Sequence, residues 1–67
     1  MNDPIIQNEV ALNYLNTLFG KAIFFKDLEK VHQLNVLRHT VYYEKDFDYE
    51  AVLKILGEIE EKLKRYE

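Results

Sequence analysis

The stretch that decides the fold runs from residue 49 to residue 66 and reads YEAVLKILGEIEEKLKRY. Its apolar residues recur at intervals of four, three, four and three positions. That spacing stacks them into one stripe along a helix and matches the seam of a coiled coil. The stripe consists of Val52, Leu56, Ile59, Leu63 and Tyr66. Leu53 and Ile55 flank it, so we predict a helix whose apolar face meets more than one neighbouring helix.

The start and the outer face of this segment also favour a helix. Asp48 can accept hydrogen bonds from the free amides of the first turn, and Phe47 before it can pack on Val52 as a hydrophobic staple. Opposite the stripe, acids stand four residues ahead of bases, which stabilises helices. These pairs are Glu50 and Lys54, Glu58 and Lys62, Glu60 and Lys64, and Glu61 and Arg65. Gly57 costs about 1 kcal/mol inside a helix, and it marks either a close approach by another helix or a solvent-facing position.

A first helix is predicted over residues 4–19. Asp3 can cap this helix, and Pro4 suits its first position. Two apolar rows follow at helical spacing: Ile6, Val10 and Tyr14 form one, and Ala11, Leu15 and Leu18 form the other. Gly20 stands where a left-handed residue often ends a helix. Ala22 and Phe25 continue the second row, so the alternative is a helix that runs on through the glycine.

A second helix is predicted over residues 22–43. The apolar run at 22–25 is either a buried connection or the first turn of this helix. Asp27, a candidate cap, then leads into apolar residues three or four apart. These are Leu28, Val31, Leu34, Leu37 and Val41. The sequence therefore predicts an all-α fold, a small three-helix antiparallel bundle with helices at about 4–19, 22–43 and 49–66, and a single domain over residues 1–67.

The size of the chain favours self-association. Its 67 residues allow one domain that buries little surface. It has no cysteine, so disulfides cannot add stability, and its 48% hydrophobic residues argue against disorder. So short a chain has more apolar helical surface than it can bury within itself. We therefore predict a homodimer formed through amphipathic helix faces.

The residue types needed for catalysis or cofactor binding are scarce. The sequence has no serine and no cysteine, which excludes the usual nucleophilic triads. His32 and His39 are seven positions apart, whereas metal-binding pairs on helices are spaced three or four apart. The two glycines are too far apart for a phosphate-binding loop. We predict no enzyme activity, no cofactor, no metal and no small-molecule substrate.

The charge and hydropathy of the chain limit its expected location in the cell and the partners that it can bind. No apolar run approaches the roughly 18–20 residues that cross a membrane, and no signal sequence follows Met1. A cytoplasmic protein without a membrane contact is expected. The net charge is −3, with a middle segment at +2 between ends at −2 and −3. This distribution suits head-to-tail packing of two copies and is a weak basis for nucleic-acid binding.

An alternative function is DNA binding by residues 25–45, which resemble a helix-turn-helix. In this resemblance the turn falls at Leu34 and the second helix opens with Arg38. The resemblance implies a small transcriptional regulator. Glu29 stands where such motifs usually have a small residue, and Gln33 stands where their turn glycine is expected.

The aromatic residues indicate protein binding. They cluster around the two connections and the C-terminal end, and tyrosine and phenylalanine are favoured at protein interfaces. With the stripe they make up the predicted interface: Phe24, Phe25, Tyr42, Tyr43, Phe47, Tyr49, Val52, Leu56, Ile59, Leu63 and Tyr66. We predict a non-catalytic protein interaction module, an adaptor, inhibitor or assembly factor, that binds itself and a larger protein through this surface.

Overall fold

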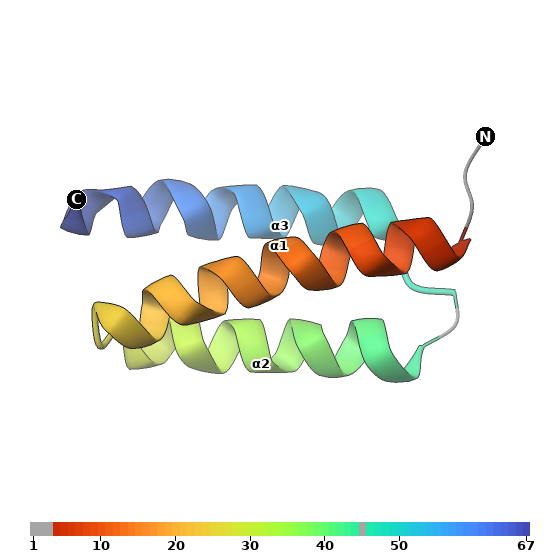
Figure 1. Ribbon diagram of the computed structural model, residues 1–67, viewed down its shortest axis with the longest axis horizontal. Helices are drawn as coiled ribbons and strands as arrows, with labels where there is room; N and C mark the ends of the chain where they lie inside the picture. The colour runs from red at the N-terminus through yellow and green to blue at the C-terminus, as the bar shows by residue number, and fades with distance from the viewer. Residues whose placement is uncertain (1–3, 45) are drawn as a thin grey trace.

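The computed structural model describes residues 4–44 and 46–67, and within these ranges the chain forms three α-helices and a short 3₁₀ turn (Figure 1). The helices are α1 (Pro4–Phe24), α2 (Leu28–Tyr43) and α3 (Tyr49–Leu63), and the 3₁₀ turn spans Lys64–Tyr66. Each helix runs opposite to the one before it (Figure 1). No described residue belongs to a strand. The predicted all-α bundle is confirmed.

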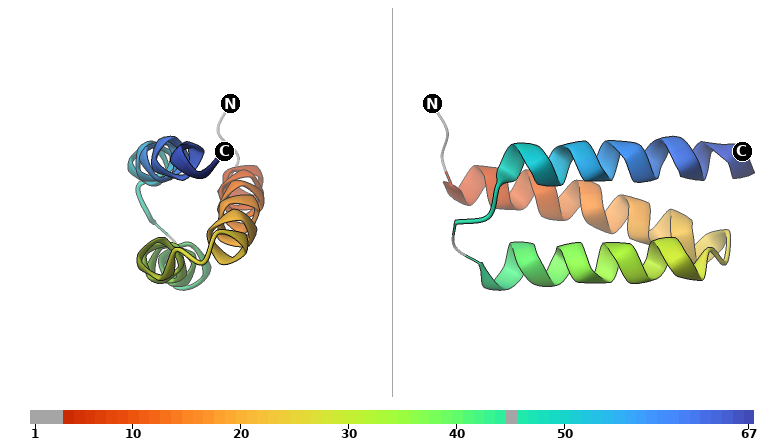
Figure 2. Two further views of the ribbon diagram at one scale, coloured as in Figure 1. Left: turned by 90° about the vertical axis from the view of Figure 1, so that its left-hand side faces the viewer. Right: turned by 180° about the vertical axis from the view of Figure 1, so that it is seen from behind.

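The core lies along the side that the helices share. α1 packs on both α2 and α3 (Figure 2). Each helix contributes one row of buried side chains to this core. They are Ala11, Leu15, Leu18 and Ala22 from α1, Leu34 and Val41 from α2, and Val52, Leu56, Ile59 and Leu63 from α3. The core is therefore built from the second predicted row of α1, part of the predicted row of α2 and the stripe of α3. The other predicted row of α1 stays at the surface, with Ile6 58% and Val10 43% exposed, and Leu28 at the start of α2 is 78% exposed.

The break that was predicted at Gly20 is wrong, because α1 continues to Phe24. Ala22 is fully buried and extends the row of Leu15 and Leu18 into the core. This packing outweighs the roughly 1 kcal/mol that a glycine costs inside a helix. The alternative, a helix that runs on through the glycine, is the observed one. Asp3, the predicted cap of α1, lies outside the described residues.

The turn between α1 and α2 is built around Lys26. Its φ of 58° is the left-handed conformation in which many helices end. The Lys26 N–H donates to the Ile23 carbonyl at 3.0 Å, and the Asp27 N–H donates to the Ala22 carbonyl at 2.9 Å. These two bonds are those of a Schellman motif, which satisfies the last carbonyls of α1. The apolar run after Gly20 thus completes α1, and α2 begins at Leu28 instead of at residue 22.

Two of the three predicted aspartate caps, Asp27 and Asp48, are confirmed. The Asp27 carboxylate accepts the backbone N–H of Lys30 at 3.1 Å, and the Asp48 carboxylate accepts that of Ala51 at 3.1 Å. Each cap satisfies an amide that has no partner within its own helix. Such caps typically contribute about 1 kcal/mol, so these two aspartates fix where α2 and α3 begin.

The end of α3 differs from its predicted boundary at 66, because its last turn tightens into the 3₁₀ turn after Leu63. None of the four predicted acid–base pairs closes to an ion pair among the described residues of α3. Lys64 instead pairs with Glu61 at 3.2 Å. Residues three apart eclipse one another in a 3₁₀ turn, so this spacing replaces the expected spacing of four.

The C-terminal end is held against the turn between α1 and α2. The Tyr66 hydroxyl donates to the Asp27 carboxylate at 2.8 Å. The Tyr66 ring stacks on the Phe25 ring with centroids 4.9 Å apart. Lys21 and Glu67 add an exposed ion pair at 3.6 Å. These contacts join all three helices at one end of the bundle.

Candidate interaction surface

The apolar stripe of α3 is used inside the chain. Four predicted interface residues lie in the core with little or no exposure: Val52 at 5%, Leu56 at 0%, Ile59 at 3% and Leu63 at 1%. Side chains of the same chain cover them, so the folded chain does not present them on its surface. A seam spacing predicts that a helix packs on other helices. It does not say whether those helices belong to the same chain.

The aromatic members of the predicted interface divide into two groups. Phe25, Phe47 and Tyr49 are half-buried and pack against the core. Phe24, Tyr42, Tyr43 and Tyr66 are exposed, by 71%, 64%, 75% and 50%. Tyr42 and Tyr43 lie together at the end of α2 with ring centroids 6.3 Å apart. Phe24 and Tyr66 lie at the opposite end of the bundle (Figure 1), so the structure does not bring the predicted interface into one patch.

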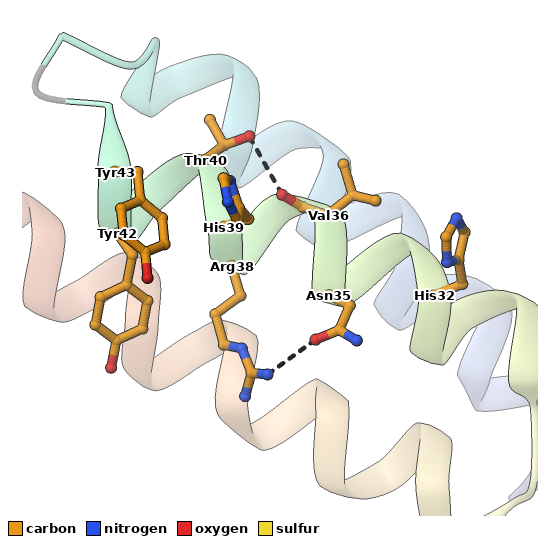
Figure 3. Close-up of a pocket in the computed structure, with 8 residues that line it drawn as sticks. All are labelled: His32, Asn35, Val36, Arg38, His39, Thr40, Tyr42 and Tyr43. Atoms are coloured by element: carbon orange, nitrogen blue, oxygen red, sulfur yellow. Dashed lines mark hydrogen bonds between the residues drawn. The ribbon is translucent and has the colours of Figure 1, made fainter.

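α2 carries a second row of side chains on the side away from the core. His32, Val36, His39 and Tyr43 follow one another at intervals of four, three and four. All four are exposed, and we call this row the outer stripe of α2. It runs along one side of the helix in Figure 3. A helix with apolar residues on both sides is typical of one that is covered on both sides.

The outer stripe borders a shallow hollow of about 820 Å³. The hollow is lined by His32, Asn35, Val36, Arg38, His39, Thr40, Tyr42 and Tyr43 (Figure 3). The His39 ring packs on the Tyr43 ring with centroids 4.5 Å apart. Thr40 donates its hydroxyl to the Val36 carbonyl at 3.2 Å. The centre of this surface is therefore an imidazole, a phenol ring and an aliphatic side chain.

One edge of the hollow is tied to the chain's own α1. The Arg38 guanidinium lies 5.0 Å from the centre of the Phe19 ring. It also donates a hydrogen bond to the Asn35 side-chain oxygen at 2.8 Å (Figure 3). Cation–π contacts of this kind contribute about 0.5–1 kcal/mol at exposed sites. Arg38 and Asn35 therefore form a polar rim that is ordered before any partner binds.

A second hollow, of about 330 Å³, lies between α2 and α3, and we call it the α2/α3 groove. It is lined by His32, Gln33, Val36 and Leu37 from α2 and by Ile55, Glu58, Ile59 and Lys62 from α3. Ile59 is buried, whereas Val36 is 54% exposed and Ile55 is 41% exposed. The groove shares His32 and Val36 with the outer stripe, so the two form one continuous surface.

A third hollow, of about 420 Å³, lies at the end of the bundle where Tyr66 contacts Asp27. The nearby Lys30 is buried, and its ammonium lies 3.6 Å from the Glu29 carboxylate. The backbone N–H of Lys30, and then the Tyr66 hydroxyl, lower the pKa of the Asp27 carboxyl below its ordinary value. Acids and bases are mixed here, so the hollow does not select a charged ligand of either sign.

The described residues contain no group of three His, Cys, Asp or Glu side chains that could hold a metal ion. His32 and His39 both lie on the outer stripe. Burial, and then the hydrogen bond that the Tyr14 hydroxyl donates to Glu60 at 2.8 Å, raise the pKa of Tyr14. That bond joins α1 to α3, so its role is structural. Across both described ranges, no helix has the length and apolar character needed to span a membrane.

Val36 and Ile55 are surface candidates that sequence reasoning missed. The spacing of the outer stripe was a signal for Val36, but the row of Leu34, Leu37 and Val41 on the other side of α2 hid it. Ile55 was read as widening the apolar face of α3 towards a second neighbour. It does lie on the side of α2, yet the groove leaves it 41% exposed.

The described part of the segment that resembles a helix-turn-helix, residues 25–44, does not have the layout of that motif. α2 is continuous from Leu28 to Tyr43, and Leu34, at the expected turn, is fully buried within it. No protein-family model, no curated protein and no solved structure gives a significant match to this chain.

Proposed function

We propose that this chain is a non-catalytic protein interaction module that buries the outer stripe of α2 against another polypeptide. The observation that carries the proposal is that α2 packs one side into the core and exposes Val36 and Tyr43, interleaved with His32 and His39, on the other side. Leu34 and Val41 are buried in the core, while Val36 and Tyr43 on the other side are 54% and 75% exposed. Burying apolar surface gains about 25 cal/mol per Å². Single exposed apolar residues are ordinary, but Val36 and Tyr43 lie on the same side of α2, and the His39 ring between them packs on Tyr43.

The composition of the surface supports the same function. It combines Val36, His39 and Tyr43 with the polar side chains of Arg38 and Asn35. Protein interfaces usually combine aromatic and aliphatic residues with polar ones. Tyrosine is enriched among the residues that dominate binding energy. The interaction is therefore proposed for α2, with the stripe of α3 serving to hold α2 in place through the core.

The partner in this proposal is either a larger protein, whose surface the chain occupies as an adaptor, inhibitor or assembly factor in the cytoplasm, or a second copy of the chain; only one of them can cover the outer stripe at a time. The ordered rim supports this role, because a surface that is already ordered loses less conformational freedom on binding. The rim charge of Arg38 would set the orientation of the partner more than the affinity.

Affinity capture with matched lysine variants tests the proposal. Tyr43→Lys places a charge on the outer stripe, and Ile6→Lys places the same charge at a 58% exposed position on α1. We expect one protein to be retained by the wild type and by Ile6→Lys, and its retention to fall at least about tenfold with Tyr43→Lys. Circular dichroism checks that both variants remain helical. Equal retention by all three proteins, or equal loss in both variants, would contradict the proposal.

A further inference from the structure

We propose that the outer stripe of α2 and the α2/α3 groove form a homodimer interface, in which α2 of each chain lies against the groove of the other. This inference rests on the proposed function, because it names one polypeptide that covers the outer stripe. That polypeptide is a second copy of this chain.

The arrangement of the two surfaces suits reciprocal docking. The outer stripe is a row of exposed side chains along α2, and the α2/α3 groove is the hollow on its other side. Because they share His32 and Val36, a stripe that lies against the partner's groove brings the partner's stripe to its own groove. Such a contact uses the same patch on both chains and closes as a two-fold dimer. It leaves no free patch of the same kind to extend into a fibre.

The composition of the outer stripe favours an antiparallel pair. Intervals of four, three and four read the same in both directions, so two stripes align in four layers whether they are antiparallel or parallel. In the antiparallel pair, Val36 lies opposite the partner's His39, and His32 lies opposite the partner's Tyr43. A parallel pair would instead place each histidine opposite the same histidine of the partner. The antiparallel register gives every imidazole an aliphatic or aromatic neighbour.

The charges of the two helices are complementary. α2 carries one net positive charge, from Lys30 and Arg38 against Glu29. α3 carries two net negative charges, with four glutamates against two lysines. In the proposed dimer, α2 of one chain approaches α3 of the other, so the net charges of the two helices attract, while the groove itself is lined by one acid, Glu58, and one base, Lys62. Complementary charge of this kind directs encounter and fixes register.

The dimer also completes a familiar packing unit. α2 and α3 of the two chains would form a four-helix arrangement with α1 of each chain on the outside. In that arrangement Val36 and Ile55, at 54% and 41% exposure in one chain, are both covered. α1 already covers the opposite side of the layer that α2 and α3 form (Figure 2). The second copy therefore covers the side of α2 and α3 that their own chain leaves open.

The solution mass of matched variants tests the interface. We expect light scattering to give the wild type twice the 8.1 kDa of one chain. Val36→Lys and Ile55→Lys each place a charge in the interface at a partly exposed position, so we expect folded proteins of 8.1 kDa. Ile6→Lys, on the outside of α1, should stay dimeric. A wild type that remains monomeric up to about 1 mM, or a dimer that survives both interface substitutions, would overturn the inference.

The absence of cysteine allows a direct test of the register. A spin label attached at Leu28→Cys occupies a 78% exposed position at the start of α2. An antiparallel pair centred between Leu37 and Arg38 separates the two labelled Cα atoms by about 29 Å along the helix axis. A parallel pair would place them about 10 Å apart. A short distance in the dimer would overturn the antiparallel arrangement.

Failure of this inference can be told apart from failure of the proposed function. A monomeric wild type that still captures a Tyr43-dependent protein would overturn the dimer and support the interaction module. A dimer that captures no other protein would support the inference and contradict binding to a larger partner.

Discussion

Asp27 connects three parts of the chain through separate atoms. Its backbone N–H closes the end of α1 at Ala22, and its carboxylate caps α2 at Lys30. The same carboxylate accepts the hydroxyl of Tyr66 at 2.8 Å. Each of these bonds favours one geometry of the turn, so the direction of α2 and the position of the C-terminal end depend on one residue.

The Tyr66→Phe substitution tests this connection through the pKa of Asp27. The Lys30 N–H lowers that pKa most, and the Tyr66 hydroxyl lowers it further. Removing the hydroxyl should raise the pKa of Asp27 towards its ordinary value of 3.8 without reaching it. Nuclear magnetic resonance titration of the Asp27 carboxyl carbon measures the change, with Tyr14→Phe as the control because Tyr14 bonds Glu60. An unchanged pKa in Tyr66→Phe would show that the bond is not formed in solution.

The lowered pKa of Asp27 also predicts a pH dependence of stability. Its folded-state pKa lies below the unfolded value of 3.8, so its ionised form stabilises the fold above that value. This contribution is lost as the pH falls through the folded-state pKa. Asp27→Asn keeps a capping side chain but does not titrate. We expect urea unfolding to give the wild type a higher free energy of unfolding than Asp27→Asn at neutral pH. This difference should shrink below pH 3.8. A difference independent of pH would contradict the role of the charge.

Among the helices, α1 tolerates a glycine in its interior because Ala22 beyond it is buried. A Cβ added at Gly20 would meet no atom within 4 Å outside its own surroundings in the helix. Gly20→Ala should therefore raise the free energy of unfolding by about 0.5–1 kcal/mol, because alanine favours the helical backbone. The change is measured from the midpoints of urea unfolding, provided that the dependence of the free energy of unfolding on urea is the same in both proteins. A loss of stability would mean that α1 bends or breaks at Gly20 in solution.

The helix α3 should be sensitive to truncation on its core side. Leu56 is fully buried, whereas Leu28 of α2 is 78% exposed. Leu56→Ala should lower the free energy of unfolding by about 2–5 kcal/mol through lost contacts and a cavity. Leu28→Ala, the same chemical change, should alter it by less than about 0.5 kcal/mol. Similar losses of stability in both variants would show that the start of α2, at Leu28, is covered.

Helix content and core rows could be predicted from the sequence because they depend on local spacing. The stripe of α3 and the caps at Asp27 and Asp48 are signals contained within a few residues. For the end of α1 the sequence left two alternatives, because Gly20 carries a stop signal while Ala22 continues the apolar row, and only the burial of Ala22 in the core decides between them. The interaction surface could not be predicted, because Leu56 and Ile59 have the same spacing whether helices of this chain or of another chain bury them.

At the scale of the molecule, the proposed dimer ties stability to concentration. A chain of 67 residues buries a small core, and association adds stability by mass action. The wild-type unfolding temperature should therefore rise with protein concentration. Each tenfold increase in concentration should add about 1.4 kcal/mol per mole of dimer to the free energy of unfolding. Val36→Lys should remove this dependence. A wild-type unfolding temperature that does not change with protein concentration would contradict association.

The central claim is that α2 packs on both sides, against its own chain and against a second polypeptide. The most direct measurement is the solvent accessibility of single side chains in the concentrated purified protein, read from relaxation caused by a soluble paramagnetic agent. The account predicts that Val36 and Tyr43 are protected almost as well as the core residue Leu34, while Ile6 stays accessible. Accessibility of Val36 and Tyr43 in line with their 54% and 75% exposure in the single chain would contradict it.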